Sequence, residues 1–398
     1  MLEVEQVQGD CITVPLGLPQ VKVLSQEELP GGAICVRVVQ RARLRSCPSC
    51  GRLTGKVHDR REQIKADVSL GGRGSVLILL KRRFRCPFCK QVFTEPDEVC
   101  GWRRKLTRRL REQLYREVST STVKAVAARA GLSEETVRRA LEEEGARELR
   151  DHEPGPVRHL GMDDFAVRKG SRYQTAFYDL EAKRVLGVVA GRTKEAVAAF
   201  LDRLAYPDSV QGVSMDMNGA YRSAVNESLP SAEIIVDKFH VIKRVNEELD
   251  HLRIRLQAGQ SRKEALYKSR YLLLRNREEL DSEGQAKLLR LFKLHPELRR
   301  GYLLKEGFRR WYRPGPKRDK RAELAAWIGY VEQEGPVEFK DLIPMLSSWK
   351  EEILNYFDFG LTNGFVEGKN TRTKAIIRQA YGYRNLDNLN LRILLPCA

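Results

Sequence analysis

The sequence lacks any long hydrophobic run. No window of its 398 residues approaches 18 uncharged apolar residues, and the longest unbroken apolar run, at positions 324–331, is only eight residues long. A membrane-spanning helix needs about 20 such residues, so the sequence predicts no membrane span and no membrane partner. The first ten residues read MLEVEQVQGD, with acids where a signal peptide has a basic flank and an apolar stretch. We therefore expect a cytoplasmic protein.

Cysteine and low-complexity sequence are also scarce. Eight cysteines among 398 residues are far fewer than a disulfide scaffold contains, and in a reducing compartment paired thiols more often bind a metal. No internal repeat is visible. A hydrophobic fraction of 42% is enough to form packed cores and excludes a chain that is disordered throughout. At about 150 residues per domain the length predicts two or three domains.

Acidic residues are outnumbered by basic ones. Lys and Arg total 71 against 53 Asp and Glu, which gives a net charge of +18 and a pI near 9.6. Each phosphate that a basic side chain neutralises releases a condensed counterion, so this surplus favours a polyanionic partner. Nucleic acid is the expected partner class.

The pattern of residue types changes several times along the chain. The first hundred residues are mostly β-like, positions 105–149 are helical, and the composition breaks at 151–156. The next part predicts a mixed α/β sheet with helices packed on it, because three strands are followed by alternating helices and strands. Its expected strands are 157–165, 173–180, 185–190, 210–215 and 234–236, and its expected helices are 193–204 and 219–228. A strand-free helical block at 242–348 and a last helix at 365–380 follow.

Two C-x2-C pairs lie within the β-like region. Cys47 and Cys50 form one pair, and Cys86 and Cys89 form the other. Two residues between thiolates let a tight turn present both sulfurs to one tetrahedral zinc ion at ~2.3 Å. The alternative is that the pairs only contribute to packing. With four protein ligands no position remains open for chemistry, so we expect one structural Zn²⁺.

Positions 121–142 have the pattern of a helix-turn-helix. Gly131 supplies the turn, Ser133 can cap the second helix, and Arg138 and Arg139 point outward from it. Just upstream, positions 103–116 carry seven basic residues and one acid, and include Arg104 and Arg108. Such a stretch suits phosphate contacts. The alternative is an ordinary helical hairpin with a solvated basic face.

Three carboxylates occupy suggestive positions. Asp163 and Asp216 lie at the ends of expected strands, and Glu367 lies at the start of the last helix. A buried acid is costly unless it is paired or binds a cation, and phosphoryl-transfer sites hold hard cations with such groups. Asp164 is an alternative to Asp163, because a strand buried on both faces shows no alternation. The three acids could also be unrelated to one another.

The motifs around these acids resemble a known family. They read Gly-Met-Asp163-Asp-Phe-Ala, Met-Asp216-Met-Asn-Gly-Ala-Tyr and Asn-Gly-Phe-Val-Glu367-Gly-Lys-Asn. They are similar to DDE-type transposases of bacterial insertion sequences, and specifically to the group with an N-terminal four-cysteine zinc finger, a helix-turn-helix and a helical insertion before the final Glu. The resemblance covers nearly the whole chain and extends to the Asp237-Lys-Phe-His240 motif, whose role it leaves unassigned.

The resemblance implies a multidomain protein with a ribonuclease H-like α/β catalytic core interrupted by an all-α insertion. Asp163, Asp216 and Glu367 would be the catalytic triad that binds Mg²⁺ or Mn²⁺, with two ions per site. Because the family usually has Glu at the position of Asp164, the resemblance selects Asp163. The implied activity is cleavage and strand transfer of DNA at the element's terminal inverted repeats and at its target, by a homodimer in the active complex associated with the nucleoid.

The chain then divides into five expected segments. They are a zinc-finger domain (1–100), a helix-turn-helix domain (101–153), the first part of the core (154–245), the helical insertion (246–348) and the last part of the core with the catalytic Glu (349–398). In the last segment Lys369, Arg372 and Lys374 adjoin Glu367 and are expected to contact the scissile strand.

Three further questions stay open from the sequence. Trp311 and Tyr312 lie among arginines and could stack on a base, although packing within the insertion is the favoured interpretation. A DNA-binding transcriptional regulator with an inactive core is one alternative function. A ribonuclease H-like nuclease or resolvase without strand transfer is another.

Overall fold

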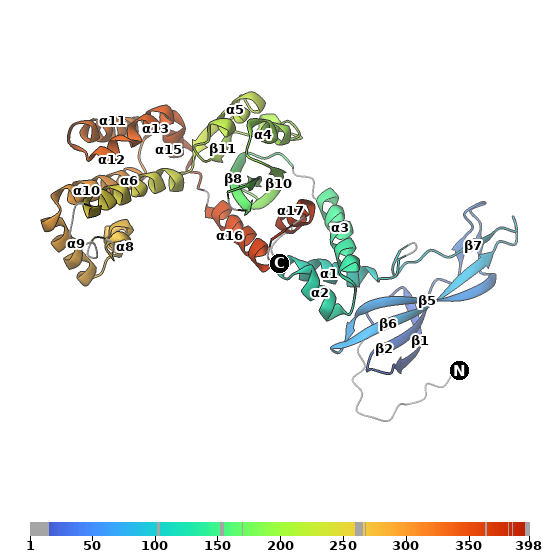
Figure 1. The fold of residues 1–398 in the computed structure, drawn as a ribbon. Helices are drawn as coiled ribbons and strands as arrows, with labels where there is room; N and C mark the ends of the chain where they lie inside the picture. The colour runs from blue at the N-terminus through green and yellow to red at the C-terminus, as the bar shows by residue number, and fades with distance from the viewer. Residues whose placement is uncertain are drawn as a thin grey trace. The chain divides into compact units, whose positions relative to one another are not determined.

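The computed structural model describes residues 16–101, 104–151, 155–168, 170–258, 266, 268–362, 364–380, 382–383 and 385–394. The chain separates into two compact units, Met1–Asp151 and His152–Pro396, and Figure 1 labels the elements of each.

The first unit begins with an antiparallel-rich sheet in the order β1-β2-β6-β5, with β7 paired to β6. Its strands are β1 (Val21–Glu28), β2 (Ile34–Gln40), β5 (Val57–Leu70), β6 (Arg73–Arg85) and β7 (Val92–Thr94), and a separate small hairpin joins β3 (Arg45–Ser46) to β4 (Leu53–Thr54). Gly71 and Gly72 close the long β5–β6 hairpin at φ values of 57° and 77°, a backbone conformation that side chains with a Cβ resist. The apolar positions of β2 and β6 form the core of this sheet.

Three helices complete the first unit: α1 (Arg108–Thr120), α2 (Val123–Ala130) and α3 (Glu134–Asp151). Thr107 and Thr122 cap the first two helices by accepting hydrogen bonds from backbone N–H groups. Gly131 ends α2 at φ 63°, and Ser133 Oγ accepts from the Thr136 N–H at 3.2 Å. These are the turn and cap that the sequence predicts for a helix-turn-helix.

A five-stranded sheet organises the second unit. Its order is β10-β9-β8-β11-β12, built from β8 (His159–Arg168), β9 (Arg172–Asp179), β10 (Arg184–Ala190), β11 (Gly212–Met215) and β12 (Glu233–Val236). The first three strands are antiparallel, whereas β11 runs parallel to both β8 and β12. Strand β11 is buried at every position, including the polar Ser214, so its sequence shows no alternation of apolar and polar residues.

Helices cover both faces of this sheet (Figure 1). On one face α4 (Lys194–Leu201) and α5 (Gly219–Ser228) pack against side chains such as Met162 and Phe177. On the other face α16 (Gly364–Gln379) and α17 (Leu386–Leu394) pack against Phe165 and Tyr178. Successive residues of a strand point to opposite faces, so residues 162 and 165 of β8 belong to different cores.

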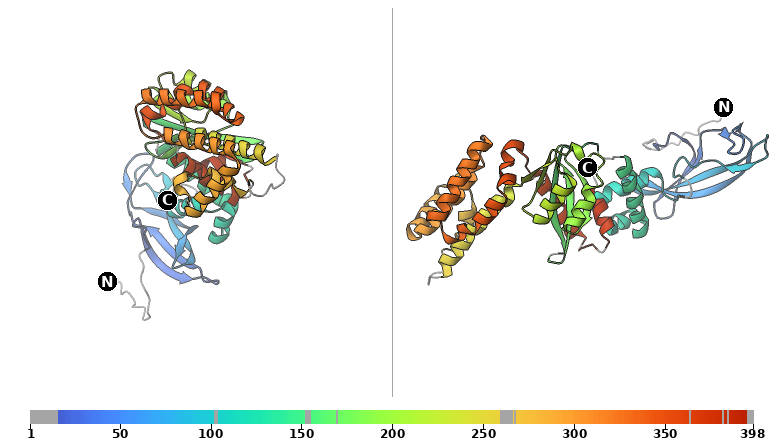
Figure 2. Two further views of the ribbon diagram at one scale, coloured as in Figure 1. Left: turned by 90° about the vertical axis from the view of Figure 1, so that its left-hand side faces the viewer. Right: turned by 90° about the horizontal axis from the view of Figure 1, so that it is seen from above.

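Between β12 and α16 the described residues form helices and no strand. The helices are α6 (Lys238–Ala258), α8 (Arg270–Leu274), α9 (Ser282–Leu294), α10 (Pro296–Trp311), α11 (Lys317–Glu334), α12 (Val337–Lys340), α13 (Leu342–Ser348), α14 (Lys350–Leu354) and α15 (Tyr356–Phe359). Helix α10 packs against α6 and α11, and Figure 2 shows these helices side by side. We call residues 238–359 the helical region.

Aromatic side chains fill the centre of the helical region. Trp311 and Tyr312 are 6% and 3% exposed and pack against Phe308 and Phe357. The Trp311 indole N–H donates to the Lys320 carbonyl at 2.9 Å. Neither ring has a free face for a nucleobase, so packing, the favoured interpretation from the sequence, is what the structure shows.

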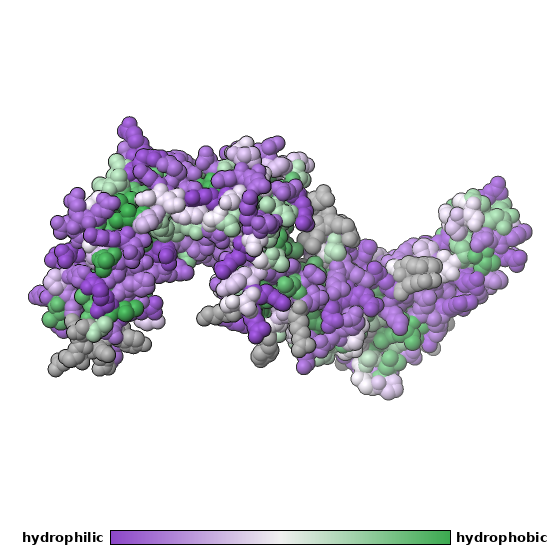
Figure 3. All heavy atoms as spheres, turned by 45° about the horizontal axis from the view of Figure 1, so that its top comes forward, coloured by the Kyte–Doolittle hydropathy of each residue, from purple (hydrophilic) through white to green (hydrophobic). Residues whose placement is uncertain are grey.

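No helix among the described residues is long and apolar enough to cross a membrane. Hydrophilic residues cover most of the face drawn in Figure 3, and the apolar patches between them are small.

Candidate active site and zinc centre

Three aspartates lie at one edge of the second unit's sheet because of strand register. In the parallel pair β8–β11, Ser214 is the partner of Gly161, and two residues further along each strand are Asp216 and Asp163. In the pair β11–β12, Met215 is the partner of Val236, so the next residue, Asp237, lies beside Asp216. The Asp237 N–H donates to the Met215 carbonyl at 2.9 Å.

A histidine joins this group of acids. Asp163, Asp216 and His240 offer potential ligand atoms that all lie within 4.8 Å of one another. His240 is in the first turn of α6, and its Nε2 lies 2.8 Å from Asp216 Oδ1 and 3.8 Å from Asp237 Oδ2. Asp237 caps the same helix, because its Oδ1 accepts from the Phe239 N–H at 3.2 Å. We call Asp163, Asp216, Asp237 and His240 the carboxylate cluster.

Burial and mutual repulsion raise the pKa values of two carboxylates in the cluster. Burial, and then the charge of Asp216, raise the pKa of Asp163 to about 7. Burial also raises the pKa of Asp237, and the charges of Asp216 and Glu367 add to this effect. Asp237 Oδ2 is buried and accepts no hydrogen bond from the described residues. Buried, mutually repelling carboxylate oxygens of this kind fit a hard divalent cation.

The structure separates Asp163 from the alternative, Asp164. Asp163 lies on the same face of β8 as Phe165, toward α16, and belongs to the carboxylate cluster. Asp164 lies on the opposite face, where its Oδ2 is 3.8 Å from Arg192 Nη1. Of the two, Asp163 is the residue that lies beside Asp216.

Helix α16 reaches the cluster through Asn370. Its side-chain amide donates a hydrogen bond to Asp163 Oδ2, and its Oδ1 accepts one from the Tyr178 hydroxyl at 3.0 Å. The close approach of α16 to β8 depends on Gly161, where a Cβ would lie 3.2 Å from Val366 Cγ2. Asn370 is part of the motif around Glu367, but its contact with Asp163 depends on tertiary packing that the sequence does not show.

Glu367 lies in the first turn of α16, three residues before Asn370, and is exposed. Among the described residues, the structure does not bring its carboxylate within the 4.8 Å separation that unites Asp163, Asp216 and His240. Its charge still acts on Asp237. The turn residue Asn363, expected to start this helix, lies outside the described residues, and the helix begins at Gly364.

The three basic residues that the sequence predicts near Glu367 lie on α16 as well. Lys374 is exposed, and Lys369 and Arg372 are half-buried. The Lys369 ammonium lies 5.3 Å from the centre of the Phe365 ring. These three residues put positive charge on the helix that also carries Glu367.

The first unit brings together all four predicted zinc ligands. The ligand atoms of Cys47, Cys50, Cys86 and Cys89 lie within 4.8 Å of one another. The Cys47 and Cys89 sulfurs are 3.5 Å apart, and those of Cys50 and Cys86 are 3.6 Å apart. Four sulfurs at ~2.3 Å from one tetrahedral ion would be separated by about 3.8 Å, so the cluster fits a structural Zn²⁺.

Two tight turns shape this zinc centre. The first turns back at Gly51, whose N–H donates to the Cys47 carbonyl at 2.9 Å, and the second at Lys90, whose N–H donates to the Cys86 carbonyl at 3.1 Å. Both residues have positive φ, 71° and 63°. A hydrogen bond from the Cys89 backbone lowers the pKa of the Cys86 thiol to about 6, which favours the thiolate that binds a metal.

The predicted DNA-binding arginines of the first unit are accessible. Arg108 and Arg139 are exposed, and Arg104 and Arg138 are half-buried. Arg104 pairs with Glu143, and Arg138 pairs with Glu135 at 2.5 Å. Together with β5, the helix-turn-helix lines a groove of about 790 Å³ whose walls include Arg104 and Arg139.

Two other arginines of the basic stretch have structural roles instead. Arg111 is buried and pairs with Glu144 at 3.0 Å, and Arg109 pairs with Asp67. The general expectation that positions 103–116 contact phosphates is therefore wrong for these two side chains, because each already neutralises a buried acid. Arg103 lies outside the described residues.

Comparison with known families agrees with this arrangement in all three parts of the chain. Residues 160–393 match the transposase family model of ISL3. The chain belongs to the ISL3 transposase family. Residues 43–89 match the zinc finger of the transposases of IS204, IS1001, IS1096 and IS1165, and residues 101–144 match the helix-turn-helix domain of the ISL3 family. The chain is thus a DDE-type transposase with a zinc ribbon and a helix-turn-helix.

Individual relatives carry the same description. The chain is 29% identical over 375 residues to the transposase for insertion sequence element IS1001 of Bordetella parapertussis, and the match covers 92% of each chain. It is 28% identical over 269 residues to the transposase for insertion sequence element IS1557 of Mycobacterium tuberculosis, covering 61% of this transposase and 60% of the relative. Neither the regulator nor the simple nuclease is favoured by these matches.

Proposed function

We propose that this transposase binds the ends of its insertion sequence and cuts and joins DNA strands at the edge of its second sheet, with Asp163, Asp216 and Glu367 as catalytic residues. The observation that carries the proposal is the register of β8 and β11, in which Asp216 lies beside Asp163. Neighbouring parallel strands bring their carboxyl ends to one edge of a sheet, where ligands of open α/β sheets bind. Glu367 is the third member because α16, which carries it, also holds Asp163 through Asn370.

The strand arrangement supports a ribonuclease H-like core. Three antiparallel strands are followed by two parallel ones, and helices cover both faces. The helical region follows β12 and precedes α16, which supports an all-α insertion between the second and third carboxylates. The five segments 1–100, 101–153, 154–245, 246–348 and 349–398 are the domain division that we propose on this basis.

Asp163, Asp216 and Glu367 would hold Mg²⁺ or Mn²⁺, with two ions per site. When bound, such ions activate the attacking oxygen and stabilise the leaving one. Carboxylate oxygens are the ligands these ions prefer. Burial and the charge of Asp216 raise the pKa of Asp163, and a bound cation would offset both effects.

The neighbouring side chains of the cluster position these ligands. Asn370 fixes the orientation of Asp163, and its own orientation is fixed by the Tyr178 hydroxyl. His240 Nε2 holds Asp216 Oδ1 at 2.8 Å. Lys369, Arg372 and Lys374 contact phosphates of the strand that is cut, since charged donors on one helix suit a backbone that runs past it.

Recognition of the terminal inverted repeats belongs to the first unit. Arg104, Arg108, Arg138 and Arg139 contact DNA, and the groove between β5 and the helix-turn-helix supports this assignment. Target DNA binds later at the same catalytic edge. Because two element ends must be joined in one reaction, a homodimer is the active complex, and binding to DNA associates the protein with the nucleoid.

A strand-transfer assay with labelled element ends tests the proposal. The wild-type protein with Mg²⁺ should cut the ends and join them to a target, and Asp163→Asn and Asp216→Asn should do neither. Cutting without joining would favour a nuclease, and binding without cutting would favour a regulator. Activity that survives both substitutions would contradict the catalytic assignment.

A further inference from the structure

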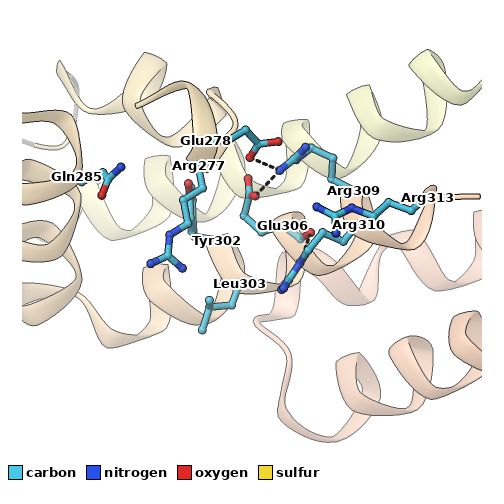
Figure 4. A pocket seen from close by; sticks show the side chains of 9 residues that line it. All are labelled: Arg277, Glu278, Gln285, Tyr302, Leu303, Glu306, Arg309, Arg310 and Arg313. Carbon is cyan, nitrogen blue, oxygen red and sulfur yellow. Dashed lines mark hydrogen bonds and ion pairs between the residues drawn. The ribbon is translucent and has the colours of Figure 1, made fainter. Parts of the chain in front are cut away.

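The helical region contains a pocket that shares no residue with the carboxylate cluster. Its volume is about 350 Å³, and its walls come from the short helix Arg277–Glu279, from α9 and from α10. Arginines dominate the lining: Arg277, Arg309, Arg310 and Arg313 face only two acids, Glu278 and Glu306. Figure 4 shows that three of these guanidinium groups come from the C-terminal end of α10 and its continuation, while Arg277 lies beside Tyr302.

The rim of this pocket carries uncompensated positive charge. Arg277, Arg310 and Arg313 are exposed, and the described part of the chain provides no ion pair for any of them. Within the described part of the chain, Arg310 donates from its Nε alone, to the Glu306 carbonyl at 3.3 Å. Three cations gathered on one rim repel one another, and an anion bound between them would remove that repulsion.

Both acids of the pocket, the exposed Glu278 and the buried Glu306, are already paired with Arg309. Arg309 Nη2 lies 2.5 Å from Glu278 Oε2 and 2.9 Å from Glu306 Oε2. Glu306 also pairs with the buried Lys305 at 2.7 Å. The acids therefore do not offset the charge of the rim, and the pocket as a whole is positive.

Two buried donors in the lining of the pocket have no acceptor among the described residues. Tyr302 is 1% exposed, and its hydroxyl forms no hydrogen bond with the described residues. The Arg309 Nε is also buried without an acceptor. Burial raises the pKa of Tyr302 to about 12, so the hydroxyl keeps its proton and remains a donor. An unsatisfied buried donor is costly, and an oxygen of a bound ligand would remove that cost.

This set of donors suits a phosphate group. The planar guanidinium presents paired N–H donors that match phosphate oxygens, and a tyrosine hydroxyl adds a neutral donor. A volume of about 350 Å³ is at the small end of ligand pockets, enough for one phosphate and part of its nucleotide.

We propose that the pocket formed by Arg277, Tyr302, Arg309, Arg310 and Arg313 binds a phosphate of the DNA backbone. The helical region is then a DNA-contacting surface in addition to the first unit and α16. This inference rests on the proposed function in one respect, that DNA is the substrate. Free phosphate would satisfy the same donors, and the experiment separates the two sources.

The test uses the full-length protein and a duplex carrying one element end. Arg310→Ala/Arg313→Ala removes two rim charges that form no ion pair with the described residues. Arg300→Ala is the matched control, because Arg300 is exposed on the same helix and does not line the pocket. Ethylation of single phosphates identifies which ones the protein contacts, and titrations over a range of salt concentrations count them.

We expect the double variant to lose interference at one or two phosphates while the remaining footprint is unchanged. The slope of log K against log salt should fall by about 0.9 per lost phosphate, which is an affinity loss of about eightfold each at ~0.1 M salt. Arg300→Ala should leave the footprint and slope as in the wild type. Tyr302→Phe, which removes only the unpaired hydroxyl, should weaken binding about tenfold without lowering the melting temperature.

Two results would overturn the proposal. One is a double variant whose footprint and salt slope equal those of the wild type. The other result combines two measurements: inorganic phosphate raises the melting temperature of the wild type but not of the double variant, and both proteins bind DNA equally well. The pocket would then be a site for free anions only. Neither readout requires catalysis, so they remain informative even if Asp163→Asn still cleaves and the proposed catalytic residues are wrong.

Discussion

The Asn370 side chain on α16 donates a hydrogen bond to Asp163 on β8 of the second unit's sheet. These residues are 207 positions apart in the sequence, yet one amide ties the helix that carries Glu367 to the strand that carries Asp163. The Tyr178 hydroxyl holds the same amide from its other end, so the orientation of the Asp163 carboxylate depends on three separate elements.

Asn370→Ala should therefore impair catalysis more than binding. Loss of the amide frees Asp163 to rotate, and we expect strand cleavage to fall at least tenfold, equivalent to ~1.4 kcal/mol in the barrier. Affinity for end DNA should change less than twofold. Asn226→Ala, at an exposed position of α5, is the control, and cleavage rates of the two variants measured side by side decide the matter.

Glu367→Gln tests the third carboxylate. The substitution preserves shape but removes the charge that a hard cation requires, so cleavage and joining should be abolished while end binding stays close to wild type. Glu332→Gln, at an exposed position of α11, should remain active. A Glu367→Gln protein that still cleaves at more than about a tenth of the wild-type rate, ~1.4 kcal/mol in barrier, would show that the triad has another third member.

Metal analysis tests the zinc centre. We expect about one zinc per chain, and Cys86→Ser should lose it, because three thiolates bind zinc less tightly than four. The first unit should then unfold at a lower temperature, while the second unit keeps its melting transition. A wild-type protein without zinc that binds end DNA normally would contradict this expectation.

Arg138→Ala/Arg139→Ala tests recognition by the helix-turn-helix. Contacts of this kind are each worth ~1–3 kcal/mol, so the double variant should bind end DNA at least tenfold more weakly. Lys22→Ala, exposed on β1, is the control for a general loss of positive charge. Equal affinity and salt slope in the double variant and the wild type would place recognition elsewhere.

Features governed by short-range physics could be predicted from the sequence. Gly131 ends α2 with positive φ and Ser133 caps α3, because turn and cap preferences act within a few residues. The three strands and alternating helices of the second unit also follow from the apolar pattern. Each cysteine pair sits in its own tight turn, which the C-x2-C spacing predicts.

Contacts that depend on packing between distant segments could not be predicted in this way. Nothing in the spacing shows that Asn370 reaches Asp163, or that His240 reaches Asp216. Arg111 reads as one more phosphate ligand in a basic stretch, and only the fold shows that it faces Glu144. The apolar pattern alone could not separate Asp163 from Asp164, since the strand is covered on both sides; only the family resemblance selected Asp163 before the faces of β8 were known.

Helix α6 has a mechanical consequence for the reaction. It begins beside the carboxylate cluster with His240, and its 21 residues extend ~30 Å into the helical region. There Leu249 and Leu252 pack so closely against α10 that a Cβ at Gly301 would lie 2.6 Å from Leu252. Tyr302 of the arginine-lined pocket is the very next residue. A force that DNA exerts on the pocket would therefore be transmitted along α6 to its first turn, where His240 contacts Asp216.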